Sequence, residues 1–412
     1  MKRTLVFLVI FLTLIMAVIS CNEKTSPAQP APEAQNTATF TSTVPVGSTS
    51  TSTATPSPTS TPANFWIMDG GYSHTLAIKT DGSLWAAGSN TDGELGICNN
   101  DNQNTFVKVT TVSNVIAIAA GRNFSLALKG DGTLWACGRN TSGQLGTGDN
   151  ENRNCFVQVF TAVKAIAAGG YHSLAVKTDG TLWASGNNSR YQLGRSDMLN
   201  KDVFSPSNGS GSTQLTDVKK VEAGEYHSIV LKNDNTVYAA GANDYGQLGY
   251  GNSMAEVWYF SLVPSITNIN KISCGAYHTM LLTGPGVLMA AGSNVDGQFG
   301  VGNTYTAYTF FTVNTDVNDV KAGDTFNLIM KNDYTVHASG DGRSGQYGDT
   351  NYTWGYSWEQ VNTGAYDIGA GYDWSFVRKG DLMYTAGANL NGQIGVGNNN
   401  SSIPSWTLLS VE

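Results

Sequence analysis

The stretch from Gly71 to Gly96 reads GYSHTLAIKTDGSLWAAGSNTDGELG, and its elements return six more times along the chain. Its last four residues are one copy of a motif that is written G-Q-L-G in its commonest form. The copies end at seven glycines: Gly96, Gly146, Gly194, Gly249, Gly300, Gly348 and Gly395. Successive copies lie 47 to 55 residues apart. Internal repeats of this length indicate a solenoid, a propeller or an array of repeats.

Each repeat predicts four short antiparallel strands. In the first copy, apolar runs on both sides of Asp81-Gly82 predict a tight β-hairpin. A further strand precedes each hairpin, as in Val115–Ala120, and another follows the G-Q-L-G motif, as in Phe106–Val109. The hairpin turn returns at six places: Asp131-Gly132, Asp179-Gly180, Asp234-Asn235, Pro285-Gly286, Asp333-Tyr334 and Gly380-Asp381.

Seven such repeats without helical periodicity predict an all-β fold, a seven-bladed β-propeller of four-stranded antiparallel blades. We expect it to span residues 64–412. Residues 65–68 would form the first strand and residues 405–409 the last, so that the chain ends meet and close the ring. An open β-solenoid is the alternative, although its coils are usually shorter.

The first 63 residues predict export and attachment to a membrane. Lys2 and Arg3 precede an apolar run, so residues 1–20 resemble a signal peptide, and the residues around Cys21 resemble a bacterial lipoprotein processing box. Cys21 would then be the lipidated mature N-terminus. An ordinary signal peptide and an uncleaved anchor are the alternatives. Residues 21–63 are rich in Ser, Thr and Pro and predict a disordered tether. We therefore expect a lipoprotein that faces the periplasm or the cell exterior and contacts the membrane through its lipid alone.

The charge of the chain argues against nucleic acid as a partner. The sequence has 23 Lys and Arg residues against 31 Asp and Glu residues, a formal net charge of −8, and no basic run. We expect a monomer that binds a protein partner, or a polysaccharide of the cell envelope, and needs no cofactor.

The repeat resembles that of the regulator of chromosome condensation family. The resemblance rests on G-x-x-H-[ST]-L, D-G-x-L-W-A-x-G and N-x-x-G-Q-L-G, and it covers residues 64–412. It implies a seven-bladed propeller whose partners differ widely between members. The eukaryotic founder is an exchange factor for a small GTPase and binds chromatin, which does not fit an exported acidic protein. Another branch includes a secreted bacterial propeller that inhibits β-lactamase through one face of its ring.

When the seven repeats are aligned, most residues of the types that bind metals or act in catalysis occupy positions that are explained by packing. The histidine column also holds aromatic residues, which predicts packed and hydrogen-bonded histidines and not zinc ligands; it reads His74, Phe124, His172, His227, His278, Phe326 and Trp374. Cys137 and Cys274 stand in columns of Ala and Ser, so we expect small core residues. Cys98 and Cys155 lie in loops of adjacent blades, and the sequence leaves open whether they form a disulfide.

Neither a metal site nor a catalytic set stands out from the repeats. The Asn- and Asp-rich loops lack the spacing of a calcium loop, and turn chemistry explains them more simply. We expect no catalysis, with a glycan-active enzyme as the remaining alternative.

Variation between the repeats predicts where a partner binds. The two positions after the first glycine of each repeat differ from blade to blade, and five of the seven blades present a tyrosine there. These loops should emerge on one face, near the axis, and loops on a rigid scaffold often carry recognition. We predict that this face binds a protein through nine residues: Tyr72, Arg122, Tyr171, Glu225, Tyr226, Tyr277, Asp324, Tyr372 and Asp373. The alternative is that the tyrosines merely cover the tops of the blades.

A second candidate surface lies between blades six and seven. Tyr352, Trp354 and Tyr356 could stack on sugars, which would make the protein a carbohydrate-binding module. An enzyme inhibitor of the β-lactamase-binding kind is the other alternative to a protein-binding scaffold. We expect the long segment from Arg195 to Thr216 to be a flexible surface loop.

Overall fold

The computed structural model describes residues 61–62, 65–252 and 256–411. The expected signal at 1–20, Cys21 and nearly all of the expected tether lie outside these residues. Every helix or strand element in the described part is a β-strand. Within the same ranges, no helix is long and apolar enough to cross a membrane.

The strands form seven four-stranded sheets, each made of four consecutive antiparallel strands, within the compact unit Pro58–Glu412. Blades 1 to 3 hold β2 (Phe65–Gly70), β3 (His74–Lys79), β4 (Leu84–Gly88) and β5 (Gln103–Lys108); β6 (Val115–Ala120), β7 (Phe124–Lys129), β8 (Leu134–Gly138) and β9 (Arg153–Phe160); and β10 (Val163–Ala168), β11 (His172–Lys177), β12 (Leu182–Gly186) and β13 (Lys201–Pro206).

Blades 4 and 5 hold β14 (Val218–Ala223), β15 (His227–Lys232), β16 (Val237–Ala242) and β17 (Glu256–Leu262); and β18 (Ile269–Cys274), β19 (His278–Thr283), β20 (Leu288–Gly292) and β21 (Ala307–Asn314). Blades 6 and 7 hold β22 (Val317–Ala322), β23 (Phe326–Lys331), β24 (Val336–Asp341) and β25 (Trp354–Asn362); and β26 (Asp367–Ala370), β27 (Trp374–Lys379), β28 (Leu382–Ala388) and β29 (Ser402–Leu408). The predicted seven-bladed propeller is confirmed.

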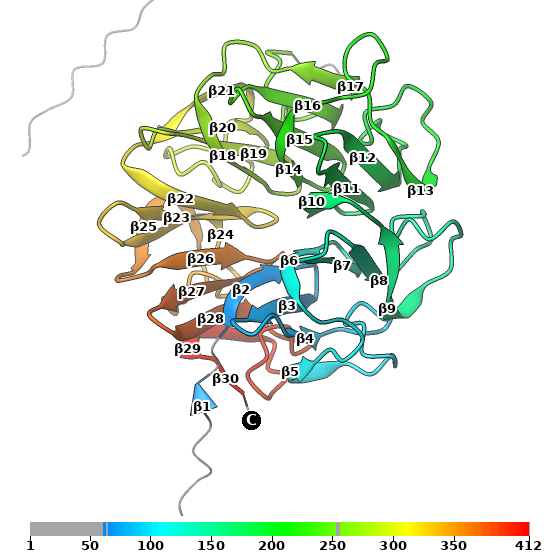
Figure 1. The fold of residues 1–412 in the computed structure, drawn as a ribbon. Helices are drawn as coiled ribbons and strands as arrows, with labels where there is room; N and C mark the ends of the chain where they lie inside the picture. The colour runs from blue at the N-terminus through cyan, green and yellow to red at the C-terminus, as the bar shows by residue number, and fades with distance from the viewer. Residues whose placement is uncertain (1–60, 63–64, 253–255, 412) are drawn as a thin grey trace, which may run out of the picture. The chain divides into compact units, whose positions relative to one another are not determined.

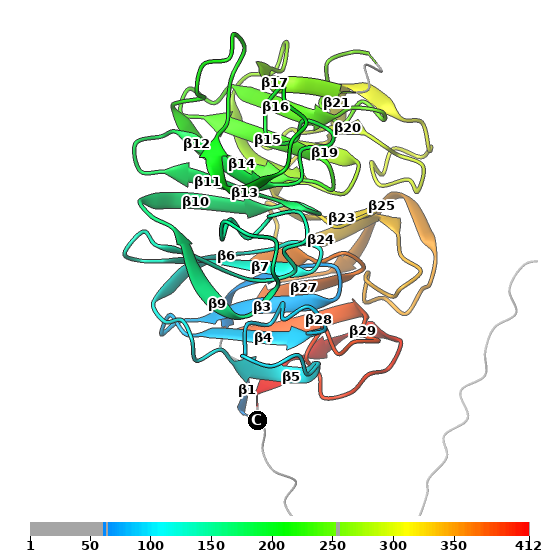
Figure 2. The same cartoon turned by 90° about the vertical axis from the view of Figure 1, so that its right-hand side faces the viewer.

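The blades surround a central axis. The first strand of each blade lies near the middle of the ring and the fourth strand at the rim (Figure 1). A short pair of strands, β1 (Thr61–Pro62) and β30 (Ser410–Val411), joins the two ends of the propeller, which lie together in both views (Figures 1 and 2). Met68 of blade 1 packs with Trp374 of blade 7 and with Leu409 in one buried cluster. The expected meeting of the chain ends is therefore confirmed, with β1 beginning before the expected start at 64.

The predicted hairpin turns are present in all seven blades. In blade 1 the Asp81 carboxylate accepts a hydrogen bond of 2.9 Å from the backbone N–H of Ser83. The second turn residue of blades 1 to 6 and the first turn residue of blade 7 have a positive φ, which favours glycine or asparagine. These residues are Gly82, Gly132, Gly180, Asn235, Gly286, Tyr334 and Gly380.

The G-Q-L-G motif is a turn that docks on the next blade. A Cβ atom on Gly146 would lie 2.6 Å from the ring of Phe204, in the outer strand of blade 3, so this position admits only glycine. Asn140 holds the turn from within: its Oδ1 accepts from the backbone N–H of Leu145 at 2.9 Å, and its Nδ2 donates to the carbonyl of Asp149 at 2.8 Å. The asparagine-rich loops therefore satisfy their own backbone, as turn chemistry predicted.

A hydrogen bond of the same type recurs between each blade and the one before it. In blade 4, Ser228 Oγ donates to the carbonyl of Gln192, in the blade 3 turn, at 2.7 Å. The same bond forms seven times, from Thr75, Ser125, Ser173, Ser228, Thr279, Asn327 and Ser375 to the carbonyls of residues 393, 94, 144, 192, 247, 298 and 346. Because Thr75 bonds to Gln393, the series closes between blades 1 and 7.

The histidine column is part of this network. His172 Nε2 lies 2.8 Å from Ser228 Oγ, and that hydroxyl already donates to Gln192, so the histidine is the donor. The ring is fully buried, and burial lowers the pKa of His172 to about 3. His278 makes the matching bond to Asn327 Oδ1 at 2.9 Å. The histidines are neutral packing residues, which confirms the prediction.

Two expectations about loops change. The prediction of a flexible loop from Arg195 to Thr216 is wrong, because this segment contains β13, and Asn208 pairs with Gln214 in an isolated bridge beyond it. The many Ser and Gly residues of this segment favoured the prediction of a loop, although the segment contains the fourth strand of blade 3. Cys98 and Cys155 form a disulfide with Cα atoms 4.4 Å apart. The disulfide links the outer loop of blade 1 to the outer strand of blade 2.

The inter-blade hydrogen bond can be tested at Ser228. Ser228→Ala removes the acceptor of His172 and the donor to Gln192, so the free energy of unfolding should fall by about 1 to 3 kcal/mol. Urea denaturation followed by tryptophan fluorescence measures the change. Ser205→Ala, in the outer strand of the neighbouring blade, should change it by less than about 0.5 kcal/mol. Equal effects of the two variants would contradict the role given to Ser228.

Candidate functional site

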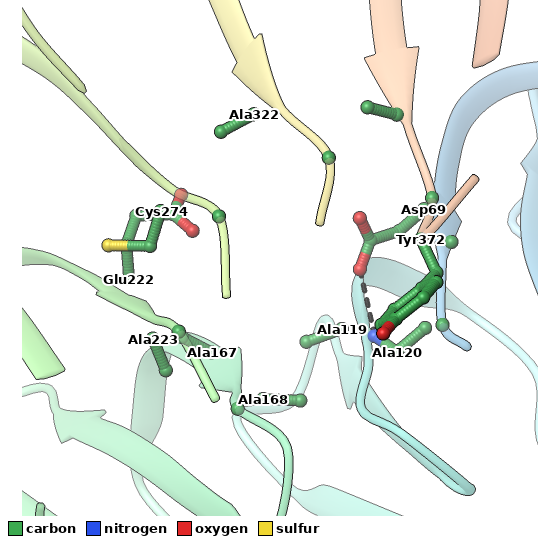
Figure 3. Close-up of a pocket in the computed structure, with 18 of the residues that line it drawn as sticks. Asp69, Ala119, Ala120, Ala167, Ala168, Glu222, Ala223, Cys274, Ala322 and Tyr372 are labelled. Atoms are coloured by element: carbon green, nitrogen blue, oxygen red, sulfur yellow. Dashed lines mark hydrogen bonds between the residues drawn. The ribbon is translucent and has the colours of Figure 1, made fainter. Parts of the chain in front are cut away.

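A channel of about 260 Å³ runs along the axis and is walled by the first strands of all seven blades. Most of its wall carries small side chains, and Figure 3 shows Ala119, Ala167, Ala223 and Ala322 around the cavity. Small residues at this radius leave open space where larger side chains would fill it. We call this cavity the axial channel.

Two carboxylates enter the axial channel from different sides. Asp69 comes from blade 1 and Glu222 from blade 4, and their side chains lie across the cavity from one another (Figure 3). Asp69 Oδ2 accepts a hydrogen bond of 2.8 Å from the backbone N–H of Ala120. Lys321 of blade 6 also lines the channel. The cavity is therefore polar and carries charges of both signs.

Sequence reasoning missed these three residues, although a signal was present. They share one column, two positions before the first glycine of the repeat, which reads Asp69, Ala119, Ala167, Glu222, Ser273, Lys321 and Gly369. A column that alternates between very small and charged residues is unusual for a packed strand, where apolar residues normally face the core.

The protein around the channel disfavours its negative charges. Burial raises the pKa of Asp69 to about 6, against the lowering effect of the Ala120 hydrogen bond. Burial also raises the pKa of Glu222 to about 7, although Lys321 lowers it. Burial opposes the charge of Lys321, but Glu222 and Asp319 outweigh it and raise the pKa of this lysine. Near neutral pH the lysine is charged and Glu222 is close to its titration midpoint.

The predicted face forms the mouth of this channel. The loops that follow the first strands line its opening in all seven blades. Backbone hydrogen bonds of 3.1 to 3.2 Å link neighbouring loops from blade 3 round to blade 1, from the N–H groups of Gly170, Glu225, Ala276, Asp324 and Tyr372 to the carbonyls of Gly224, Ala276, Asp324, Tyr372 and Gly71. Around most of the mouth, from blade 3 round to blade 1, the loops are therefore joined by their backbones.

The tyrosines lie around this ring, as predicted. Tyr72 and Tyr372 line the opening with ring centroids 4.4 Å apart. Tyr171 and Tyr226 stack at 5.8 Å. Tyr277 packs against Tyr245 of the blade 4 turn and is 38% exposed, as is Tyr72. We call Tyr72, Tyr171, Tyr226, Tyr277 and Tyr372 the mouth tyrosines.

An ion pair crosses one half of the mouth. Arg122 Nη1 of blade 2 lies 2.7 Å from Glu225 Oε1 of blade 4, so the pair passes over blade 3. Blade 3 has Gly170 there, and a Cβ on it would lie 2.5 Å from the Glu225 carboxylate. The Arg122 guanidinium also lies 4.9 Å from the ring of Tyr72 and 5.5 Å from that of Tyr171. A cation is thus held between two tyrosine rings and a carboxylate.

The other half of the mouth carries acids. Asp324 lines the opening and accepts a hydrogen bond from the Tyr372 hydroxyl. Burial raises the pKa of Asp324 to about 7, and the carboxylates of Asp373 and Glu225 add to the shift. Burial and Asp341 raise the pKa of Asp373 to about 6, against the opposing effect of Arg343. Asp373 does not line the channel itself.

The second predicted surface lies on β25, the outer strand of blade 6, and on the residues just before it. Tyr352, Trp354 and Tyr356 are 50%, 42% and 44% exposed. The guanidinium of Arg343 lies 4.3 Å from the ring of Trp354 and supports one face of it. Trp354 and Tyr356 lie on the outer strand of blade 6, and the Tyr352 hydroxyl lies 3.3 Å from Ser402 Oγ on the outer strand of blade 7, so this surface reaches the junction of blades six and seven. Trp358 on the same strand is structural, because it packs on Gly300.

Cys274 differs from the expected small core residue. It lines the axial channel and is half-buried, whereas Cys137 is buried as expected. Burial and the nearby Glu222 raise the pKa of the Cys274 thiol, so it stays neutral and is a poor nucleophile. Among the described residues, no group of three or more His, Cys, Asp or Glu side chains is placed to hold a metal ion.

The titration of Glu222 gives a testable dependence of stability on pH. The folded protein keeps this proton up to about pH 7, whereas an ordinary glutamate loses it near 4.5, so the free energy of unfolding falls as the pH rises between these values. Glu222→Gln should therefore raise the melting temperature at pH 8 by about 1 to 3 °C. This increase in melting temperature should become smaller below pH 7 and be absent below pH 4.

Differential scanning fluorimetry from pH 4 to pH 8 measures this gain. Asp101→Asn removes an exposed carboxylate from the outer loop of blade 1 and serves as the control. A gain that does not vary with pH, or one that the control matches, would contradict the burial of Glu222 as its cause.

Comparisons with known proteins agree with this architecture. The secretion-regulating guanine nucleotide exchange factor of Mus musculus is 35% identical over 102 residues, which are 24% of this chain and 22% of that protein. The ultraviolet-B receptor UVR8 of Arabidopsis thaliana is 30% identical over 88 residues, or 21% and 20% of the two chains. The matches span only about a fifth of the length of these relatives.

Two solved structures have the same fold. Human WBSCR16 superposes with a TM-score of 0.70 at 17% identity, over 80% of this chain and 93% of that one. Yeast RCC1 (Prp20), solved bound to Kap60, gives a TM-score of 0.67 at 22% identity, over 75% and 78% of the two chains. The family model described as the RCC1-like domain matches residues 31–314, well over half of the sequence. The protein therefore belongs to the RCC1-like domain family.

Proposed function

We propose that this protein is a membrane-anchored, extracytoplasmic scaffold without catalytic activity, and that it binds a protein partner through the mouth of its axial channel. The observation that carries the proposal is the set of mouth tyrosines on loops that backbone hydrogen bonds link from blade 3 round to blade 1. RCC1-like propellers in general serve as binding and regulatory proteins; yeast RCC1 has been solved with Kap60 bound.

The mouth has the composition and stiffness of a binding site. Tyrosine and arginine are enriched at the centres of protein interfaces, where aromatic side chains bury large areas and lose few rotamers. Because hydrogen bonds hold the loops to one another, little conformational entropy remains to be lost on binding. The exposed rings of Tyr72 and Tyr277 offer apolar surface beside charged groups.

The location of the scaffold rests on sequence alone. We infer from residues 1–20 that the chain is exported and from Cys21 that it is lipidated. Residues 22–63 would then act as a tether that holds the propeller away from the membrane. An inhibitor of an extracytoplasmic enzyme would use the same mouth, and the identity of the captured partner distinguishes it from a scaffold.

Affinity capture tests the proposal. A bait that begins at residue 58, and so keeps β1, should retain a protein from cell-envelope extract or growth medium. A variant with alanine at Tyr171, Tyr226 and Tyr277 should lose at least about 100-fold in affinity, because residues at the centre of an interface carry most of the binding energy. Mass spectrometry identifies the partner, and titration of that partner measures the loss.

A matched control uses three tyrosines that are exposed outside the mouth: Tyr305, Tyr334 and Tyr366. Alanine at these positions changes the composition equally and should leave capture unchanged. Equal capture by both triple variants would exclude the mouth as the binding surface.

The aromatic residues of blade 6 favour carbohydrate as a second candidate ligand. Trp354 and Tyr356 lie two positions apart on β25 and are both exposed on one side of the strand. Flat rings in a row can stack on successive sugars, and Arg343 holds Trp354 in place. This ligand would bind at the rim, away from the mouth.

Trp354→Ala tests the carbohydrate candidate. If the rim binds polysaccharide, retention on immobilised cell-envelope polysaccharide should fall about tenfold or more, because an aromatic stacking contact is removed. Trp258→Ala removes a tryptophan that is 55% exposed on blade 4 and should have no effect. Unchanged retention of the Trp354 variant would exclude this surface.

A further inference from the structure

The mouth of the axial channel is unequal in its two halves. Across blades 2 to 4 a cation already occupies it, because Arg122 lies between the rings of Tyr72 and Tyr171 and pairs with Glu225 at 2.7 Å. In this half of the mouth, a guanidinium group fits beside a carboxylate that is flanked by tyrosine rings.

The other half offers the same surroundings without a cation from this chain. Asp324 stands in the same repeat position as Glu225, directly after the first glycine of its repeat. Tyr372 donates its hydroxyl hydrogen to Asp324, and Tyr277 precedes it around the ring. Among the residues that the structure describes, no Lys or Arg forms an ion pair with Asp324.

Arg343 and Lys271 are engaged elsewhere. Arg343 pairs with Asp341 at 2.6 Å, and Lys271 pairs with Asp319 at 2.9 Å. Arg122, bonded to Glu225, influences Asp324 less than burial does. Asp373 and Glu225 add negative potential to the same half of the mouth. An incoming positive charge would therefore meet carboxylates whose repulsion it relieves.

A guanidinium or ammonium group on a slender stem fits this half. A cation over a tyrosine ring gains about 0.5 to 2 kcal/mol, and a charge-assisted hydrogen bond to a carboxylate is stronger than a neutral one. Anionic groups fit poorly at Asp324, because Asp373 and Glu225 already add negative potential there and Arg122 is neutralised by Glu225.

We propose that the protein partner inserts an arginine or lysine side chain into the mouth at Asp324, between Tyr277 and Tyr372. The inference rests on the proposed function and deepens it, since it names the chemistry of the partner at its point of entry. Arg122 holds the same place in the opposite half of the mouth. The inserted side chain completes a mouth in which each half pairs a cation with a carboxylate.

The first test uses small probes on the full-length protein. N-acetylarginine amide and N-acetyllysine amide carry the proposed cations, and N-acetylcitrulline amide has the shape of the arginine probe without its charge. Ligand-observed NMR at pH 8 should show binding of a cationic probe at least about tenfold tighter than the citrulline probe, as expected for loss of a charge-assisted contact. Equal binding of all three probes would overturn the proposal.

Variants locate the binding site. Asp324→Asn keeps the shape of the side chain and should reduce binding of the arginine probe about tenfold or more. Asp101→Asn changes the net charge equally at an exposed outer loop and should leave binding unchanged. Because the folded protein disfavours the Asp324 carboxylate, the asparagine variant should melt no lower than the parent at pH 8, which verifies folding. Unaltered binding to a folded Asp324→Asn variant would overturn the proposal.

Capture of the partner by the different variants distinguishes a failure of this inference from a failure of the proposed function. If the mouth tyrosine variant loses the partner but Asp324→Asn keeps it with unchanged affinity, the mouth is the binding surface and the inserted cation is wrong. If both variants lose the partner and Asp101→Asn retains it, both statements stand. If capture yields no partner, the probe titrations decide the cation site by themselves.

Discussion

The hydrogen bond between each blade and the turn of the preceding blade is the interaction on which the rest of the structure depends. A hydroxyl or amide on the second strand donates to a backbone carbonyl in the G-Q-L-G turn, as Ser228 does to Gln192. The buried carbonyl needs a donor, since an unpaired polar group in the core is strongly unfavourable. The histidines add a second bond to the same side chain, a hydroxyl in three cases and the Asn327 amide oxygen in the fourth. Glycine at the end of the turn lets an aromatic ring of the next blade pack directly against the backbone.

Closure of this series into a ring gives the mouth its stiffness. Thr75 of blade 1 bonds to the Gln393 turn of blade 7, and β1 pairs with β30 near the same junction. The blades cannot fan apart without breaking several of these bonds, so the loops at the axis keep fixed positions. A second series of backbone bonds then joins the loops themselves. Side chains that point from this ring can differ from blade to blade without loss of the fold, because the bonds beneath them involve other atoms.

The repeats made the fold predictable, whereas the site depends on contacts that a single repeat does not contain. The hairpin at Asp81-Gly82 is local, so its strands and its turn could be predicted from a few residues. The pairing of Arg122 with Glu225 joins residues 103 positions apart and requires that Gly170 lack a side chain. The channel residues could be found only by comparing one column across all blades. The segment from Arg195 to Thr216 was misjudged because its Ser and Gly residues concealed β13.

The acids of the channel and the mouth favour the proposed binding surface over a mere covering of the blade tops. Glu222 and Asp324 have pKa values near 7 because the folded protein disfavours their charge, so at neutral pH they reduce the stability of the fold. Other blades show that the same columns accept alanine, as at Ala119 and Ala276. Tyrosines that served only as a cover would gain nothing from a poorly solvated carboxylate among them. A ring held by seven inter-blade bonds can tolerate such groups, and a partner that supplies the opposite charge would remove their unfavourable contribution.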